Sequence, residues 1–254
     1  MMIGYNVDLA TALLYAFWIF FAGLIWYLHR ENKREGYPMV SENPHSKVAA
    51  IGYPAPPPSK SYRMASGETF LVEGGRPDNR PIAAKPASNY PGTPLDPTGD
   101  PMVDGVGPAA WAERADHEDM THEGVHKIVP LRVATGFYLE SRDPDPRGMN
   151  VKGDDGVSGG TIKDVWVDRS EYIARYLEVS LADGSGSVLL PVNFSRIDGT
   201  KREVRVAAVL GKHFAKAPRT KNPDSVTLLE EDKICGFYGG GTLYATPDRK
   251  EPIL

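Results

Sequence analysis

The stretch HEGVH, at residues 122–126, contains the residue types and spacing of a zinc site. In many metalloproteases two histidines one helical turn apart ligate Zn²⁺, and the glutamate between them acts as a general base. That arrangement needs a stable helix, which Gly124 inside the motif and Pro130 just after it both oppose. The H-x-x-G-x-x-H continuation that supplies a third ligand is also absent. We therefore interpret the motif as a loop and keep a membrane-anchored zinc hydrolase as an alternative hypothesis.

The residues around this motif could instead carry protons. Three histidines and four carboxylates lie within residues 116–126, DHEDMTHEGVH. Histidine has an unperturbed pKa of about 6.5, so it exchanges protons near neutral pH, and it also captures divalent metals. One interpretation is a solvated acidic loop. The other is the mouth of a proton path, with His122, Glu123 and His126 as its candidate residues.

A second group of charged residues lies within GGTIKDVWVDRSEYIARYLEVSL, residues 159–181. Strand alternation places Glu171 and Arg175 on the same face as the apolar Ile173. These charges either form an internal ion pair or, together with Asp168, line a polar passage toward a partner. Carboxylates that are clustered and shielded from water are expected to have raised pKa values. Such carboxylates could relay protons near pH 7.

Composition limits the classes of protein that could present these groups. The chain has 254 residues, and its 29 basic and 33 acidic residues give a net charge of −4. Without a basic excess to neutralise phosphates, we predict no nucleic-acid partner. The single cysteine, Cys235, excludes an internal disulfide framework and a cysteine-rich metal site, and it fits a reducing compartment.

A membrane-spanning helix is predicted near the N-terminus. Leu9–Leu28 is twenty residues without a charge, which is the length needed to cross about 30 Å of hydrocarbon. Basic residues follow it directly at Arg30, Lys33 and Arg34, whereas residues 1–8 contain none. By the positive-inside rule, the N-terminus is outside and the rest of the chain is in the cytoplasm.

Residues 36–110 contain 14 of the 22 prolines and show no helical or strand periodicity. Because aromatic residues are spread through this segment, we predict an ordered extended strap over 36–125 rather than a disordered linker. A small hairpin is predicted within it, with Ser61–Met64 and Glu68–Val72 flanking a turn at Ser66 and Gly67.

From residue 127 the pattern changes to short strand-like runs separated by segments rich in Gly, Asp and Pro. They predict a small antiparallel barrel over 126–254, after a first region at 1–35 and the strap at 36–125. A C-terminal helix is expected to begin at Thr227, which has capping-box spacing to Glu230, and to stop at Gly239–Gly241. The predicted strands are KIVPLRV, TIKDVWVD, EYIARYLEVSL, SVLLPV and REVRVAAVL, and the predicted separators are DPDPRG, VKGDDGVSGG, ADGSG and RIDGT.

Several long motifs, in order, give the chain a resemblance to the H subunit of the purple bacterial photosynthetic reaction centre. They are FWIFFAGLIWYL, REGYP, PTGDPMVDGVGPAAW, DVWVD, ARYLEV and LLEEDKICGFYGGGTLYATP. The strand region also resembles a PRC-barrel. The fold class implied is a single transmembrane helix plus a mainly β cytoplasmic domain with an extended proline-rich strap and a C-terminal helix.

The resemblance implies a non-catalytic structural subunit in the photosynthetic, intracytoplasmic part of the bacterial inner membrane. It would cap the L and M subunits near a light-harvesting antenna, contact membrane lipids, and conduct protons toward the secondary quinone through Asp168, Glu171 and Arg175. The chain alone would bind no cofactor, although its complex would hold bacteriochlorophyll, bacteriopheophytin, quinones and non-haem iron. Relatives bind inhibitory zinc or cadmium at an H-x-H site whose spacing is missing here, where only His122, Glu123 and His126 fall in that region. A membrane-tethered PRC-barrel adaptor is a further alternative.

Overall fold

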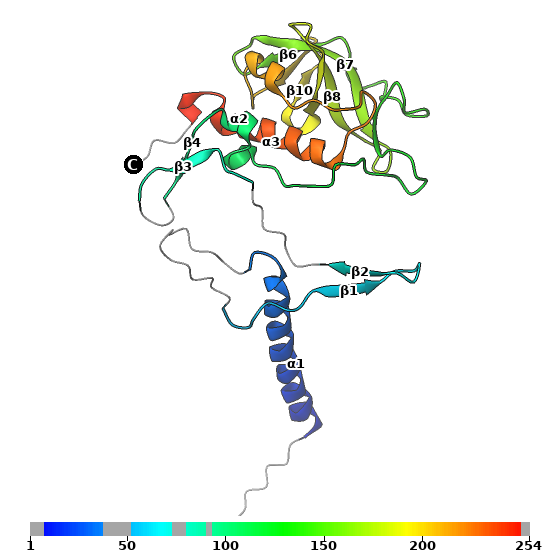
Figure 1. The fold of residues 1–254 in the computed structure, drawn as a ribbon. Helices are drawn as coiled ribbons and strands as arrows, with labels where there is room; N and C mark the ends of the chain where they lie inside the picture. The colour runs from blue at the N-terminus through cyan, green and yellow to red at the C-terminus, as the bar shows by residue number, and fades with distance from the viewer. Residues whose placement is uncertain (1–7, 38–51, 73–79, 90–92, 250–254) are drawn as a thin grey trace, which may run out of the picture. The chain divides into compact units, whose positions relative to one another are not determined.

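The structure is a computed structural model that describes residues 8–37, 52–72, 80–89 and 93–249 (Figure 1). The chain divides into two compact units, one of residues 1–79 with 88–94 and one of residues 80–87 with 95–254. The parts of the predicted strap at 38–51, 73–79 and 90–92 lie outside the described residues. The proposed boundaries at residues 35 and 125 remain predictions.

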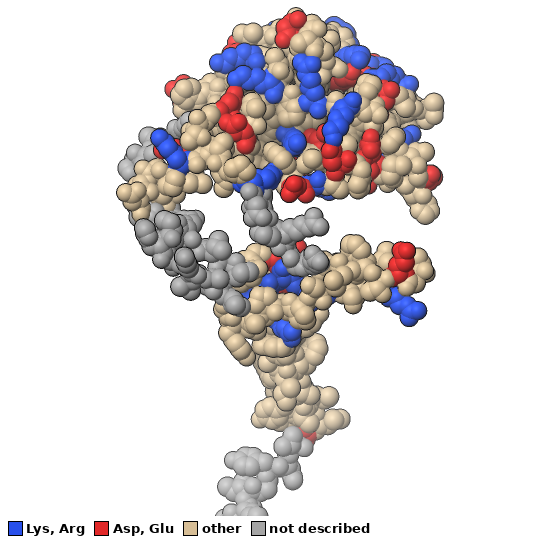
Figure 2. Space-filling view, viewed as in Figure 1, with Lys and Arg blue, Asp and Glu red and all other residues tan. Residues whose placement is uncertain are grey.

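The first unit is built on α1 (Leu9–Glu31). Asp8 caps this helix, because its Oδ1 accepts a hydrogen bond from the Thr11 amide at 2.8 Å. None of the helix residues is buried, and an 18-residue window within Leu9–Arg34 has a mean hydropathy of 2.0, so the segment is long and apolar enough to cross a membrane. In Figure 2 the helix surface is almost free of charge. The predicted N-terminal spanning helix is confirmed.

The C-terminal end of α1 contacts a later segment of the chain, at Pro54 and Lys60. The Lys60 ammonium lies 2.6 Å from a Glu31 carboxylate oxygen, and the buried Lys33 donates to the Pro54 carbonyl at 2.8 Å. Strand β1 (Lys60–Arg63) begins at this ion pair and pairs antiparallel with β2 (Thr69–Val72). The predicted hairpin is confirmed, with its turn at residues 64–68.

The second unit contains a seven-stranded sheet. Six strands follow the order β10-β11-β6-β7-β8-β9, and β5 pairs with the C-terminal half of β7. All pairs are antiparallel except β6–β11, which is parallel. The strands are β5 (Ile128–Pro130), β6 (Asn150–Gly153), β7 (Ser158–Asp168), β8 (Ile173–Leu181), β9 (Ser187–Pro191), β10 (Arg196–Asp198) and β11 (Glu203–Val206); β3 (Ala84–Pro86) and β4 (Leu95–Pro97) form a separate pair.

The predicted mainly β fold is confirmed, with two corrections. No ladder joins β9 to β10 within the described residues, so the sheet is not a closed barrel, and it is not wholly antiparallel. Strands β6 and β10 lie in segments that we predicted to be separators. Their glycines and aspartates disfavour strands, but pairing with β7 and β11 outweighs that weak local preference.

The C-terminal helix α3 (Leu228–Tyr244) begins as predicted and ends later than predicted. Thr227 Oγ1 accepts from the Glu230 amide and the Glu230 carboxylate accepts from the Thr227 amide, which completes the capping box. The predicted stop at Gly239–Gly241 is wrong, because the helix continues through these glycines. A Cβ at Gly240 would lie 2.4 Å from the Ala109 Cβ, in the short helical segment η2 (Gly107–Ala109). The glycines allow close packing instead of ending the helix.

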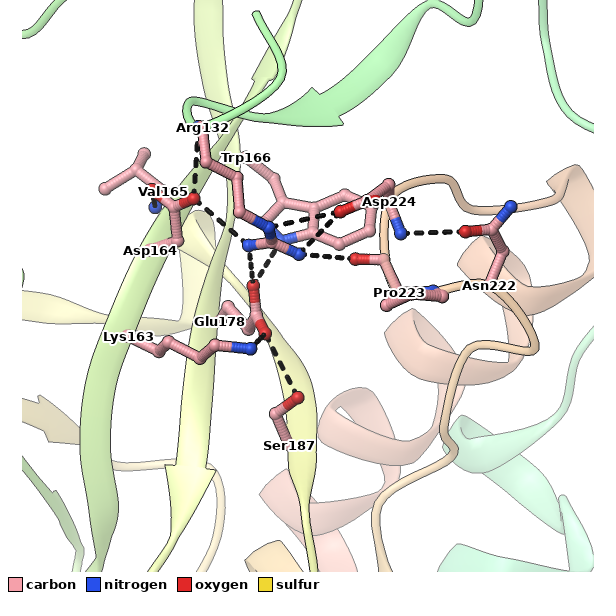
Figure 3. Close-up of polar contacts among 10 residues, drawn as sticks. All are labelled: Arg132, Lys163, Asp164, Val165, Trp166, Glu178, Ser187, Asn222, Pro223 and Asp224. Carbon is pink, nitrogen blue, oxygen red and sulfur yellow. Dashed lines mark hydrogen bonds and ion pairs between the residues drawn. The ribbon is translucent and has the colours of Figure 1, made fainter.

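One hydrophobic core joins the sheet to α3, with Trp166, Phe214, Phe237 and Tyr238 as its largest fully buried side chains. Beside it, Arg132 connects three parts of the unit (Figure 3). Its Nη1 lies 2.6 Å from Glu178 Oε2 on β8 and 3.1 Å from Asp164 Oδ2 on β7. Its Nη2 donates to the Pro223 carbonyl, in the loop before α3, at 2.6 Å.

Replacing Gly240 by alanine tests the packing role of the α3 glycines. Alanine normally stabilises a helix interior by about 1 kcal/mol relative to glycine. Here we expect the opposite sign, a loss of about 1–3 kcal/mol from overpacking against Ala109. Thermal denaturation of the detergent-solubilised chain measures it. Thr242→Ala, at an exposed position on α3, is the control and should leave stability nearly unchanged; a more stable Gly240→Ala protein would contradict the packing argument.

Replacing Arg132 by methionine tests the connection in Figure 3. The change leaves the buried carboxylates of Glu178 and Asp164 without their shared cation, so we expect destabilisation of about 3 kcal/mol in chemical denaturation. Lys163→Met is the matched control, because Lys163 also contacts Glu178 but is 52% exposed. Equal losses in both variants would show that Arg132 has no special role.

Candidate functional site

Asp168 is the centre of the candidate site, at the last residue of β7. Its side chain is fully buried, between Ile128 of β5 and Ile173 of β8. Oδ1 accepts hydrogen bonds from the backbone amides of Ser170 and Glu171, both at 2.9 Å. The carboxylate therefore holds the turn between β7 and β8 in place.

Glu171 and Arg175 join Asp168, as the sequence predicted. The Arg175 guanidinium lies 3.2 Å from Asp168 Oδ2 and 2.9 Å from Glu171 Oε2. Glu171 is 49% exposed whereas Asp168 is buried, so the cluster runs from the surface into the protein. The three predicted residues form one ion-pair network.

The predicted strand face for Glu171 is wrong. Glu171 lies in the turn before β8, not in the strand, and Tyr172 beside it has a φ of 58°. The β7–β8 register shifts between Trp166 and Val167, which leaves Arg175 as the extra residue of a bulge. Ile173, expected in the core, is 45% exposed. The bulge and turn thus bring the charges together where simple alternation would have put them on a core face.

The expected raised pKa at Asp168 is also wrong. Burial alone would raise it, but the hydrogen bonds from the Glu171 and Ser170 amides outweigh that effect. Together with the charges of Arg175 and Lys127, they lower the pKa of Asp168. Asp168 therefore remains ionised at neutral pH and serves as a fixed negative charge.

Lys127 belongs to the cluster and was missed from sequence. Its ammonium lies 3.6 Å from Asp168 Oδ2, 3.5 Å from Glu171 Oε1 and 3.5 Å from Asp119 Oδ2. Burial would lower the pKa of Lys127, but the charges of Asp168, Asp119 and Glu171 raise it. Lys127 reaches the cluster because it immediately precedes β5, which pairs with the end of β7.

The HEGVH motif forms a turn, not a helix. The Thr121 amide donates to the Val125 carbonyl and the Gly124 amide donates to the Thr121 carbonyl, with a φ of 76° at Gly124. His122, Glu123 and His126 are all exposed. This geometry removes the helical basis of the zinc-hydrolase hypothesis, and no group of three His, Cys, Asp or Glu that could hold a metal is found among the described residues.

The turn residues are near the cluster in sequence but are not bonded to it through their side chains. The His126 carbonyl accepts hydrogen bonds from the Arg169 guanidinium, whose backbone amide donates to the Lys127 carbonyl. In the part of the chain that the structure describes, no side-chain hydrogen bond or ion pair links His122, Glu123 or His126 to Asp168. Their predicted role in proton transfer remains a prediction.

Glu231 of α3 was also missed and has the opposite electrostatic character to Asp168. Burial raises the pKa of Glu231, and the hydrogen bond from Tyr176 and the charge of Arg175 offset this only in part. The Tyr176 hydroxyl donates to Glu231 Oε2 at 2.8 Å. Glu231 and Asp168, which both interact with Arg175, thus have pKa values shifted in opposite directions.

This arrangement combines a half-exposed carboxylate, fixed charges and a carboxyl group with a raised pKa. The carboxylate of Glu171 is half-exposed to solvent, and Asp168 and Arg175 supply charges beside it. Burial raises the pKa of Glu231, so this carboxyl group binds a proton more readily than an exposed glutamate does. The described side chains do not include a nucleophile paired with a general base at this site.

Two family models match the chain. Residues 1–133, just over half of it, match the N-terminal region of the photosynthetic reaction centre H chain. Residues 140–211 match the PRC-barrel domain. The first match contains α1 and Lys127, and the second contains Asp168, Glu171 and Arg175. The charged cluster is therefore built from both matched regions.

Replacing Asp168 by asparagine should change stability in a pH-dependent way. Because its folded-state pKa is lowered, Asp168 contributes stability above its unfolded pKa of about 3.9, and that contribution is lost as pH falls through the folded value. We expect Asp168→Asn to be less stable than wild type by about 1–3 kcal/mol at pH 7. The difference should vanish in acid.

Chemical denaturation of the detergent-solubilised chain between pH 3 and pH 8 would measure this, over a range set by the pKa of about 3.9. The exposed Asp143→Asn variant is the control, with a small and pH-independent effect expected. A loss for Asp168→Asn that stays constant through acid pH would show that its charge is not what stabilises the turn.

Proposed function

Because the chain belongs to the family of photosynthetic reaction-centre H subunits, we propose that it caps the L and M subunits and conducts protons toward the secondary quinone. Family membership makes it a membrane-associated structural subunit that associates with the reaction-centre core. The proposal adds the site of action, which is the cytoplasmic face next to the quinones, and the absence of catalysis by this chain itself.

The charges that flank α1 support the proposed orientation. His29 and Arg30 lie in its last turn, Lys33 and Arg34 follow, and the N-cap residue is Asp8. Positive residues concentrate on the cytoplasmic side of spanning helices. This supports our proposal of a periplasmic N-terminus and a cytoplasmic second unit, in a chain that would lie in the photosynthetic, intracytoplasmic part of a bacterial inner membrane.

The proposed complex supplies the pigments and redox groups. Bacteriochlorophyll, bacteriopheophytin, quinones and non-haem iron would be bound by the L and M subunits, and this chain would shield the quinone end from solvent. Further partners would be the light-harvesting antenna and membrane lipids. Electron transfer would then take place in the core, while this chain would affect the protons that accompany it.

The ion-pair network of Asp168, Glu171, Arg175 and Lys127 is the observation that carries the proton-conducting role. It extends from a half-exposed carboxylate to a fully buried one within a single continuous set of contacts. A buried charge gives little net stability compared with apolar packing, so the fully buried carboxylate of Asp168 suits a functional purpose. Glu231 would extend the same region toward α3.

The alternative functions receive less support. A PRC-barrel adaptor would account for the match over residues 140–211 but not for the H-chain match over residues 1–133. A zinc hydrolase would need the two HEGVH histidines on a helix, and they lie on a turn.

The proton role is tested by combining Asp168→Asn with Glu171→Gln in the intact complex. Removing both charges should slow proton-coupled reduction of the secondary quinone by about tenfold, because proton delivery then limits the second electron transfer. The first charge separation should be unchanged. Time-resolved absorption after one flash and after two flashes separates the two steps.

Glu140→Gln is the matched control, since Glu140 is a half-exposed carboxylate of the same unit outside the cluster. It should leave both steps at wild-type rates. Unchanged second-electron kinetics in the double variant would remove the proton-path assignment. If the complex that co-purifies with this chain lacked bacteriochlorophyll absorption bands, the proposal that the chain is part of a photosynthetic reaction centre would be contradicted.

A further inference from the structure

A groove over β6, β10 and β11 is separate from the Asp168 cluster. Its volume is about 450 Å³, within the range of small-ligand sites. None of Asp168, Glu171 or Arg175 lines it. The side chains that matter here are Lys152, Asp154, Asn193, Phe194, Arg196 and Arg205.

Three cationic residues form one row across the strands of this groove. Arg196 of β10 lies directly opposite Arg205 of β11, and Arg205 lies beside Lys152 of β6. Residues in register on neighbouring strands project from the same face of the sheet. Like charges placed directly opposite each other destabilise a sheet. The row therefore needs negative charge to compensate it.

The protein compensates this row only in part. The nearly buried Glu203 places one carboxylate oxygen 2.6 Å from the Lys152 ammonium and the other 2.6 Å from the Arg205 guanidinium. One carboxylate thus faces two cations. The exposed Arg196 forms no ion pair with any residue that the structure describes. The row retains a positive excess.

The other nearby carboxylates are already engaged. Asp154, which also lines the groove, lies 2.8 Å from the Arg249 guanidinium. Asp198 of β10 lies in the next row, opposite Glu203, and its Oδ1 accepts from the amides of Thr200 and Lys201. The residues that line the groove thus include three cations, Lys152, Arg196 and Arg205, and one carboxylate, Asp154.

Protection of a sheet edge explains only part of this pattern. β10 is an edge strand, where a charge such as Arg196 discourages pairing with other chains. Arg205 and Lys152 lie on inner strands, where no such protection is needed. The groove also contains the exposed Asn193 side chain and the ring of Phe194, which stacks on Tyr238 at 6.0 Å. These groups provide a polar contact and an apolar floor for a ligand.

We infer that this groove binds a phosphate ester, through Arg196, Arg205 and Lys152. Guanidinium groups present paired donors that match phosphate oxygens, and lysine adds a point charge. One phosphate would compensate the positive excess, and the carbon part of the ester would lie against Phe194. A soluble phosphate ester and the headgroup of an anionic phospholipid share this chemistry.

The test measures binding to the intact complex in mild detergent by isothermal titration calorimetry. The probes are glycerol 3-phosphate, dihexanoylphosphatidylglycerol and, as a zwitterionic comparison with no net charge, dihexanoylphosphatidylcholine. Arg196→Gln should weaken binding of the phosphate probes by about tenfold, because it removes a charge-assisted hydrogen-bonding group. Arg196→Lys should restore part of the affinity. Arg205→Gln should weaken it as well.

Arg142→Gln is the matched control, because Arg142 is 87% exposed on the same unit and does not line the groove. It should bind as wild type does. Binding of glycerol 3-phosphate that Arg196→Gln weakens would show that a soluble ester is sufficient. Binding of phosphatidylglycerol alone, also weakened by Arg196→Gln, would identify a site for a lipid headgroup. Equal affinity in Arg196→Gln and wild type, or no heat of binding with either anionic probe, would overturn the inference without bearing on the proton role.

Discussion

The Arg132 guanidinium holds three parts of the larger unit together: β7, β8 and the loop before α3. By binding Glu178 and Asp164, it fixes the segment after β5 against β7 and β8. Because β5 begins at Ile128, opposite Asp168, this contact also places Lys127 at the charged cluster. The same guanidinium binds the loop before α3 and so helps to locate Glu231 beside Tyr176. A basic side chain outside the candidate site thus sets the spacing inside it.

Two carboxyl groups near Arg175 are tuned in opposite directions by their surroundings. Asp168 receives two amide hydrogen bonds and neighbouring positive charge, which favour its ionised form despite complete burial. Glu231 receives a hydrogen bond from the Tyr176 hydroxyl, and burial raises its pKa. Such a difference separates a permanent charge from a group that can take up and release a proton. Burial alone would not have distinguished them.

Local sequence patterns were sufficient to predict several helices and turns and part of the Asp168 cluster. The uncharged run of α1, the turn at Gly67 and the capping box at Thr227 each depend on residues close in sequence, and each was predicted. The end of α3 was not predicted, because its glycines pack closely against Ala109, which is more than a hundred residues away in the sequence. Lys127 and Glu231 were missed for the same reason, since strand pairing and helix packing bring them to Asp168 and Arg175. The pKa of Asp168 depended on backbone amides that no side-chain pattern reveals.

The parallel pairing of β6 with β11 has a consequence for the order of folding. Strands β7, β8 and β9 are joined by short turns, so their pairs can form from local contacts. Lys152 and Arg205, which are neighbours across β6 and β11, are separated by about fifty residues of chain. Closing a loop of that length carries a larger entropic cost, which is recovered only after the intervening hairpins exist. Lys152 therefore joins the cationic row late, whereas Arg196 and Arg205 face each other across the local β10–β11 hairpin.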